Sequence, residues 1–327
     1  MSEAAFGVVA FMLAAYVVLD GYDLGVAAIS PLLGRTDRER AALMESIGPF
    51  WNGNEVWLIA AGGALFALFP KAYAVAFSGF YLPLIVVLWM LMFRGIAMEL
   101  RGHYDSEIWH QFWDAAFALS SFLLILLFGV ALGNLLRGVP LDAHGYFAGT
   151  FAFLLNPYAL LVGLFAVAAL AAHGALFAAA RIDGAPAARA RRLMRVLWWI
   201  VLALDAGVTA ATFAVRGAPS APWLYVLPLL SLAALGGILV LAHRAMFGAF
   251  LCSCAFLATL LAEAAGSIFP YIVPAYPLGA GGLSIYAAAP SPASLAVALC
   301  VTIAGGAVAI AYGAYVTRKM AGKVRVE

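Results

Sequence analysis

Gly-Pro-Phe-Trp-Asn-Gly-Asn-Glu-Val-Trp-Leu, residues 48–58, opens an apolar run that is long enough to cross a lipid bilayer. Two amides, one carboxylate and two indoles stand here, where lipid-facing side chains would be expected. Polar groups at the mouth of a hydrophobic helix are costly unless they face protein or water. Asn52 and Glu55 are three residues apart and therefore share one helix face. The stretch predicts a membrane helix with a polar, functional beginning.

The composition around this stretch is that of a membrane protein. Of the 327 residues, 66% are hydrophobic and only 10% are charged. A soluble domain needs far more charge on its surface, so lipid must be the main solvent of this chain. The net charge of +2 does not indicate a nucleic-acid partner, because the positive residues lie in short loops rather than on one face, and no nucleic acid is expected as a partner. Cys252, Cys254 and Cys300 lie in apolar runs without a Cys-x-x-Cys pair, so no metal site and no disulfide framework is expected.

The apolar runs predict an all-α polytopic membrane protein. A bilayer core requires about 20 apolar residues per helix, and on that scale the chain contains nine candidate spans. They cover residues 5–29, 51–70, 74–98, 112–136, 151–180, 195–215, 222–242, 246–270 and 293–317. No connection between them is long enough for a soluble domain, so residues 1–327 are expected to form a single transmembrane helical domain. The Pro-rich segment 271–277 and the glycine run 279–282 predict a loop that is not helical throughout.

Positive charge then orients the nine predicted spans. One side of the membrane receives all but three of the 18 Lys and Arg residues, and the other side receives only Lys71, Arg137 and Arg216. Because cytoplasmic loops carry an excess of Lys and Arg, the N-terminus is predicted outside and the C-terminus in the cytoplasm. An odd number of spans agrees with termini on opposite sides.

With this orientation, several acidic residues fall toward the cytoplasmic side, at or just inside the membrane surface. They are Asp20, Asp23, Glu55, Glu99 and Asp114. Together with Asn52 and water, a chain of buried carboxylates can carry protons inward, so these six residues are candidates for a proton route. Asp20 and Asp23 lie on one helix face with no cation nearby in the sequence, which favours a function in proton handling or subunit contact.

Two of these acids are equally compatible with a purely structural role. Asp114 stands near a helix start, where capping or the helix dipole accounts for it equally well. Glu99 can instead pair with Arg94 or Arg101 at the interface.

Three ionisable residues, His173, Asp205 and Glu263, lie deeper in the predicted bilayer. Glu263 is far from both ends of its span, which makes it a functional-site candidate, with a hydrogen bond to Ser or Thr on another helix as the alternative. His173 is a conceivable haem ligand, but no second histidine is predicted at its depth. Haem binding by this chain alone is therefore not expected.

Several motifs resemble subunit II of the cytochrome bd-type quinol oxidases, including the cyanide-insensitive branch. They follow the family's order and cover the first half of the chain densely. These stretches are Leu-Asp-Gly-Tyr-Asp-Leu-Gly at 19–25, residues 46–59, Gly-Gly-Ala-Leu-Phe-Ala at 62–67, Ala-Phe-Ser-Gly-Phe-Tyr at 76–81, Phe93-Arg94, Gly-Asn-Leu-Leu-Arg-Gly-Val-Pro at 133–140, Leu-Asn-Pro-Tyr at 155–158 and Phe269-Pro270.

The resemblance implies a terminal oxidase in a bacterial cytoplasmic (inner) membrane, which oxidises quinol and reduces O2 to water. Haems b and d and the quinol site are implied in the partner, subunit I, and this chain is implied to hold no haem. Its implied roles are to stabilise subunit I and to supply part of a cytoplasmic proton route. The resemblance leaves open whether small single-span subunits attach and whether a quinone binds to this chain.

One position departs from the family's pattern. Many relatives have an acidic residue directly after the first Trp of the second motif, where this chain has Asn52. Glu55 shares its helix face and is the candidate to take over that role. The candidates for structural or subunit contacts are Trp51, Trp57, Arg94, Asn134 and Glu263.

A function from another class is also compatible with intramembrane acids. Asp and Glu within glycine-broken helices would suit a proton-coupled secondary transporter. However, the two halves of the chain show no convincing internal repeat with matching broken helices. The quinol oxidase subunit is therefore the favoured hypothesis.

Overall fold

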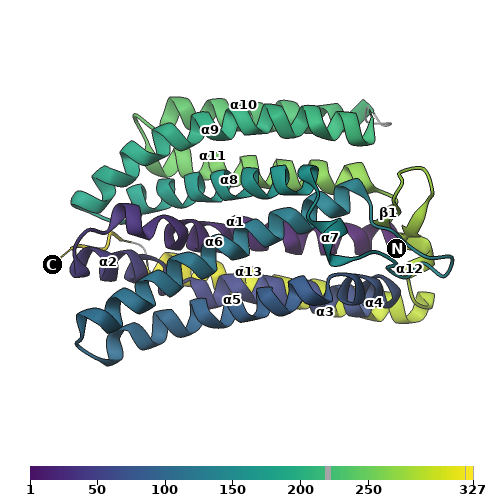
Figure 1. The fold of residues 1–327 in the computed structure, drawn as a ribbon, viewed down its shortest axis with the longest axis horizontal. Coiled ribbons are helices and arrows are strands. Elements are labelled where there is room, and N and C mark those ends of the chain that lie inside the picture. Colours follow the sequence, from purple (N-terminus) through teal and green to yellow (C-terminus); the bar gives the residue numbers. More distant parts are fainter. Residues whose placement is uncertain (218–221, 321, 327) are drawn as a thin grey trace.

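The computed structural model describes residues 1–217, 222–320 and 322–326. Long helices run side by side along one direction, and the two termini lie at opposite ends of the bundle (Figure 1). These helices are α1 (Ser2–Leu33), α3 (Trp51–Leu68), α5 (Tyr81–Leu100), α6 (Glu107–Arg137), α8 (Pro157–Arg181), α9 (Ala185–Arg216), α10 (Val226–Leu241), α11 (Met246–Ile268) and α13 (Pro292–Lys319). The predicted all-α membrane architecture is confirmed.

Within the described ranges, seven helices are long and apolar enough to cross a membrane. They are α1, α5 with the following 3-10 turn, α6, α8, α9, α11 and α13. The two other predicted spans correspond to α3, which begins with the polar stretch, and to α10, which has only 16 residues and is preceded by a 3-10 turn at Pro222–Tyr225. Nine spans therefore remain a prediction.

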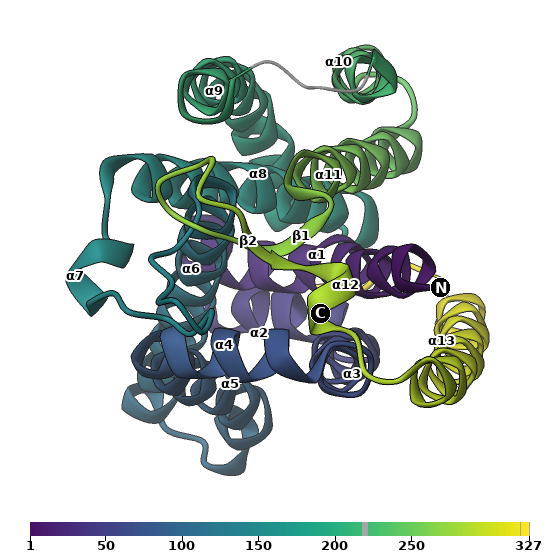
Figure 2. The same ribbon diagram turned by 90° about the vertical axis from the view of Figure 1, so that its right-hand side faces the viewer.

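Two predicted spans contain a break that the apolar pattern does not show. The span predicted at 74–98 is divided into α4 (Pro70–Gly79), which lies across the end of the bundle, and α5 (Figure 2). The span predicted at 151–180 is divided into the short α7 (Phe151–Leu154) and α8. Asn156 causes the second break, because its side chain caps α8 by accepting from the Ala159 amide at 2.9 Å, and Pro157 suits the first helical position.

The segment after α1 folds into a helix of its own, α2 (Asp37–Ile47), outside the apolar runs. Its start is a capping box. The Thr36 hydroxyl accepts from the Glu39 amide at 3.3 Å, and the Glu39 carboxylate accepts from the Thr36 amide at 3.2 Å. α2 lies at the same end of the bundle as the C-terminus (Figure 1).

The C-terminal tail closes over the turn between α8 and α9. Val324 pairs with Ile182 in a parallel bridge, in which the Val324 amide donates to the Arg181 carbonyl at 2.9 Å and the Asp183 amide donates to the Val324 carbonyl at 3.0 Å. Lys323 and Asp183 add an exposed ion pair at 2.8 Å. Residues far apart in the chain are thereby joined at this end.

The opposite end of the bundle carries the segment that was predicted to be non-helical. It forms two short antiparallel strands, β1 (Tyr271–Pro274) and β2 (Gly282–Ser284), followed by α12 (Ile285–Ala288). The loop after α6 joins them, since the Val139 amide donates to the Pro274 carbonyl at 3.0 Å. This confirms the break in helical structure that the prolines and glycines predict.

The core of the bundle is formed where α1 meets α8. In the most apolar part of α8, 72% of the residues are buried, against 6% in α13, so α8 is central and α13 is peripheral. A Cβ atom on Gly25 would overlap the Leu170 carbonyl oxygen, and one on Gly174 would overlap the Gly25 carbonyl carbon. The two backbones therefore touch, which is how small residues pack membrane helices.

We expect Gly25→Ala to lower the free energy of unfolding by about 1–3 kcal/mol, because the added methyl group forces α1 and α8 apart. Thermal unfolding of the purified full-length protein in detergent measures the effect. Gly207→Ala is the matched control, since Gly207 is an exposed glycine in α9 with nothing within 4 Å of the added Cβ. A Gly25→Ala variant that melts at or above the wild-type temperature would contradict this packing.

Candidate functional site

A buried ion pair joins α1 to α5. The guanidinium group of Arg94 donates to both carboxylate oxygens of Asp20, from Nη1 to Oδ2 at 2.8 Å and from Nη2 to Oδ1 at 2.5 Å. Both side chains are almost completely buried, with exposed fractions of 1% for Arg94 and 0% for Asp20. This two-pronged geometry is the strong form of an ion pair, and burial makes each charge depend on the other.

The pair lies well inside the length of α1. Because α1 continues past Pro31 to Leu33, Asp20 lies about 20 Å along the axis from that end of the helix. Its position at or just inside the membrane surface stays a prediction. The sequence also showed no cation near Asp20, since 74 residues separate it from Arg94.

The second acid on this face of α1 has a different partner. Asp23 is fully buried, and its Oδ2 accepts from Nδ2 of Asn54 at 2.7 Å. The same amide nitrogen lies 2.7 Å from the Tyr22 hydroxyl and 3.2 Å from the Leu19 carbonyl oxygen. The other carboxylate oxygen of Asp23 is buried and has no hydrogen-bond partner among the described residues. Asp23 therefore has an acceptor atom available for water or a proton.

The two amides of α3 have different environments. Asn52 is exposed, whereas Asn54 is buried and contacts Asp23. The burial of Asn54 could have been predicted from the sequence, because small and apolar residues follow it at helical spacing. Asn54, Trp57, Ala61, Ala64 and Leu68 form one buried stripe.

Glu55 is half-buried beside this cluster. It interacts electrostatically with both Arg94 and Asp20, so three of the predicted residues meet around one position. Trp51 lies against α5, within 3.6 Å of the place where a Cβ atom on Gly95 would stand. Trp57 is buried and packs edge-on against Phe11, with the ring centroids 6.0 Å apart. We define the buried acid cluster as Asp20, Asp23, Asn54, Glu55 and Arg94.

Asp114 and Glu99 lie outside the buried acid cluster. Asp114 pairs with Arg101 at 2.7 Å and with Arg40 at 2.8 Å, and Arg101 also pairs with Asp37 at 2.5 Å. These ion pairs, rather than helix capping, account for Asp114. Glu99 is exposed, and neither of the two arginines considered for it pairs with it, because Arg94 binds Asp20 and Arg101 binds Asp114.

Asn134 lies inside the bundle and forms hydrogen bonds to neighbouring segments of this chain. It is fully buried, its amide donates to the Leu154 carbonyl at 2.8 Å, and its oxygen accepts from Asn156 at 2.9 Å. Because Asn156 also caps α8, these two amides hold α6, α7 and α8 together. Asn134 is thus an internal contact of this chain.

His173 has no ring nitrogen left for iron. Its Nδ1 lies 2.7 Å from the Ser253 hydroxyl, its Nε2 lies 3.1 Å from the Val18 carbonyl oxygen, and its ring stacks on Phe250. An axial haem ligand needs a free nitrogen, so this residue does not fit that role. Among the described residues, no three His, Cys, Asp or Glu side chains gather as a metal site would require.

Glu263 is half-buried in α11 and faces two neighbouring helices. The buried Asp205 of α9 lies near enough for its charge to act on Glu263. Oε1 of Glu263 is buried and has no hydrogen-bond partner among the described residues, and the Ser231 hydroxyl of α10 donates to the Pro228 carbonyl at 2.9 Å. The functional and the hydrogen-bonding alternatives for Glu263 both stay predictions.

Comparison with known proteins gives one consistent family. Residues 1–320 match the family model described as cytochrome bd terminal oxidase subunit II. The chain is 33% identical to the cytochrome bd-I ubiquinol oxidase subunit 2 of Escherichia coli K12, over 98% of this chain and 94% of that protein. It is also 33% identical to the probable cytochrome oxidase subunit 2 of Haemophilus influenzae, over 96% and 92%. The bd oxidase structure from Geobacillus thermodenitrificans shares the fold, with a TM-score of 0.81 at 18% identity and 98% coverage of both chains.

We expect Arg94→Met to lower the free energy of unfolding by about 3–5 kcal/mol, because it leaves the Asp20 carboxylate buried without a cation. The double variant Asp20→Asn/Arg94→Met should be more stable than Arg94→Met alone. Thermal unfolding of all the variants in detergent gives the coupling between the two residues. Lys323→Met is the matched control in an exposed pair and should cost about 0–1 kcal/mol. Equal losses for Arg94→Met and Lys323→Met would contradict a strong buried pair.

Glu39 gives α2 a dependence on pH. Its pKa lies below the usual value, first because Arg189 pairs with it at 2.5 Å and further because the Arg35 and Thr36 amides donate to it. Folding therefore favours the carboxylate, and this stabilisation is present above the ordinary pKa of about 4.3 and is lost as the pH falls through the lower folded value.

We expect amide protection of residues 37–47, measured by hydrogen exchange and corrected for intrinsic rates, to fall below about pH 4 in the wild type. Glu39→Gln should lower this protection at neutral pH and flatten its acid dependence. Glu45→Gln, at an exposed position of α2, should behave like the wild type. Identical acid profiles for Glu39→Gln and the wild type would rule out this role.

Proposed function

Because the chain belongs to the family of cytochrome bd terminal oxidase subunit II, which it matches over residues 1–320, we propose that it works as the non-haem subunit of a membrane quinol oxidase. Such a complex oxidises quinol and reduces O2 to water. The haem-bearing subunit I is the proposed partner, and this chain has no activity alone. A match over nearly the whole chain to subunits of this oxidase does not favour the secondary transporter.

The proposed orientation puts the N-terminus outside and the C-terminus in the cytoplasm of a bacterial inner membrane, with nine spans. Support comes from the basic connections. The segment before α2, the start of α9 and the C-terminal tail all lie at one end of the bundle (Figure 1). The N-terminus lies at the other end. By the positive-inside rule, the end with α2 faces the cytoplasm.

The buried acid cluster is proposed to carry protons from the cytoplasmic side toward the oxygen-reducing haem. The observation that carries this proposal is the buried Oδ1 atom of Asp23, which has no partner among the described residues, three residues along α1 from Asp20. Arg94 binds both oxygens of Asp20, and Asn54 orients Asp23. Glu55, which is half-buried, connects this interior to the protein's exterior. Asn52, Glu99 and Asp114 would lie at the approach to it.

The second proposed role is to stabilise subunit I through apolar helix faces. α13 is exposed along most of its length, and α3 exposes Val56, Ile59 and Phe66. α13 packs beside α3 (Figure 2), and both helices expose apolar side chains. Trp57, Arg94 and Asn134 are buried inside this chain, so they would act on the partner only through the shape of this subunit. Haems b and d are proposed to lie in subunit I.

We expect the affinity-purified chain to bring with it a second large membrane subunit and the reduced-minus-oxidised haem signals. In that complex, Glu55→Gln should lower quinol-driven O2 uptake by about tenfold or more while leaving the haem content intact, because it removes a group that takes up and releases protons. Turnover and the haem spectrum are measured on the same preparation.

Glu45→Gln is the control, since it makes the same chemical change at an exposed position of α2. Loss of haem in Glu55→Gln would make Glu55 structural. Unchanged turnover would remove it from the proton route. A chain that purifies alone and colourless would overturn the assignment to an oxidase complex.

A further inference from the structure

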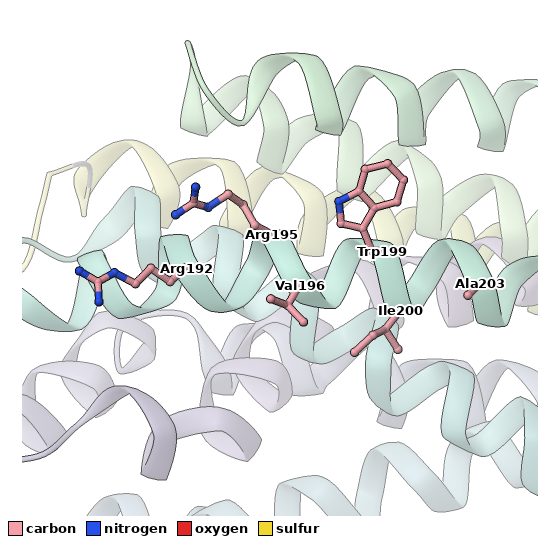
Figure 3. A pocket seen from close by; sticks show the side chains of 6 residues that line it. All are labelled: Arg192, Arg195, Val196, Trp199, Ile200 and Ala203. Carbon is pink, nitrogen blue, oxygen red and sulfur yellow. The ribbon is translucent and has the colours of Figure 1, made fainter.

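A shallow, wide-open groove of about 620 Å³, formed by side chains of one helix, follows the outer surface of α9 near the end of the bundle that carries α2 and the C-terminus. It is lined by Arg192, Arg195, Val196, Trp199, Ile200 and Ala203. Figure 3 shows the two guanidinium groups toward one end of the groove and Trp199 farther along the same helix. All six residues are exposed, so neighbouring helices do not fill the groove.

The charged end of the groove has no acidic partner among the described residues. Arg189, one turn earlier, is paired with Glu39, but Arg192 and Arg195 make no ion pair in the described part of the chain. Nε of Arg195 donates only to the Arg191 carbonyl, at 3.2 Å. Two guanidinium groups three residues apart therefore present their remaining donors on one side of α9, where they match the oxygens of a phosphate group.

The whole groove is about as long as one leaflet is thick. From Arg192 to Ala203 the helix rises about 16 Å, which is close to half of a hydrocarbon core of about 30 Å, and the apolar part from Val196 to Ala203 accounts for about 10 Å of it. Trp199 is 61% exposed and stands between the arginines and the apolar end. An indole at this depth is typical of the membrane interface.

We propose that this groove is a binding site for an anionic phospholipid, whose phosphate lies between Arg192 and Arg195 and whose acyl chain follows Val196, Trp199, Ile200 and Ala203. This site goes beyond the proposed oxidase function, and it requires neither the proton route nor a particular orientation of the chain. Charge complementarity selects an anionic lipid over a zwitterionic one, since each arginine near a membrane surface favours an anionic headgroup about fivefold. A free phosphate ion would leave the apolar part of the groove unused.

Trp199 itself can report the occupant. The purified full complex is placed in nanodiscs that contain equal amounts of phosphatidylglycerol and phosphatidylcholine, with bromine atoms on the acyl chains of one lipid or of the other. Bromine quenches a neighbouring indole, and the difference between the wild type and Trp199→Phe isolates Trp199 from the other tryptophans. We expect brominated phosphatidylglycerol to quench Trp199 several-fold more strongly than brominated phosphatidylcholine.

Arg192→Gln should reduce this preference about fivefold, and Arg192→Gln/Arg195→Gln should abolish it. Arg191→Gln is the matched control, because it removes one charge from the same turn of α9 without touching the groove, and it should keep the preference. Equal quenching by the two lipids, or an equal loss in Arg191→Gln, would overturn the site. The absence of quenching by either lipid would mean that another protein segment covers the groove, which also overturns it.

Discussion

The fully buried pair of Asp20 and Arg94 is the interaction on which the rest of the structure depends. In a medium of low dielectric constant neither charge is tolerable alone, so α1 and α5 must meet in one register for the chain to fold. That register places Asp23 against Asn54 of α3 and brings Glu55 beside the pair. One electrostatic requirement thus aligns three helices and assembles the groups that the proposed proton route uses.

On the other side of α1, small residues allow close packing against α8. The contact of Gly25 with Gly174 lets α8 approach until the backbones touch, and this close packing excludes water from the region around His173. The polar interior is therefore narrow, with hydrogen bonds that lead only to a few specific partners. The proposed proton route would therefore depend on these few side chains.

Helix positions could be predicted from the sequence because hydropathy is a local property, and most apolar runs became helices close to where they were expected. The breaks at α4 and α7 were not predicted, because apolar side chains continue through both of them. The second break does have a signal in the sequence, since Asn156-Pro157 is typical of a helix start. Asp20 and Asp23 could be singled out from their helical spacing. Their partners Arg94 and Asn54 could not, since contacts across 74 and 31 residues depend on how helices pack.

The pairing of Val324 with Ile182 has a consequence for how the protein is made. At about 5–20 residues per second, roughly 7 to 30 s pass between synthesis of these two residues. Before Val324 is synthesised, the turn between α8 and α9 lacks the two backbone hydrogen bonds that Val324 makes, although both helices are complete for most of this period. Until the tail arrives, the Arg181 carbonyl and the Asp183 amide are without these two partners. The hydrogen bonds form only when the tail reaches the turn. Because Val324 follows α13, a closed turn indicates a chain in which all the later helices have been synthesised.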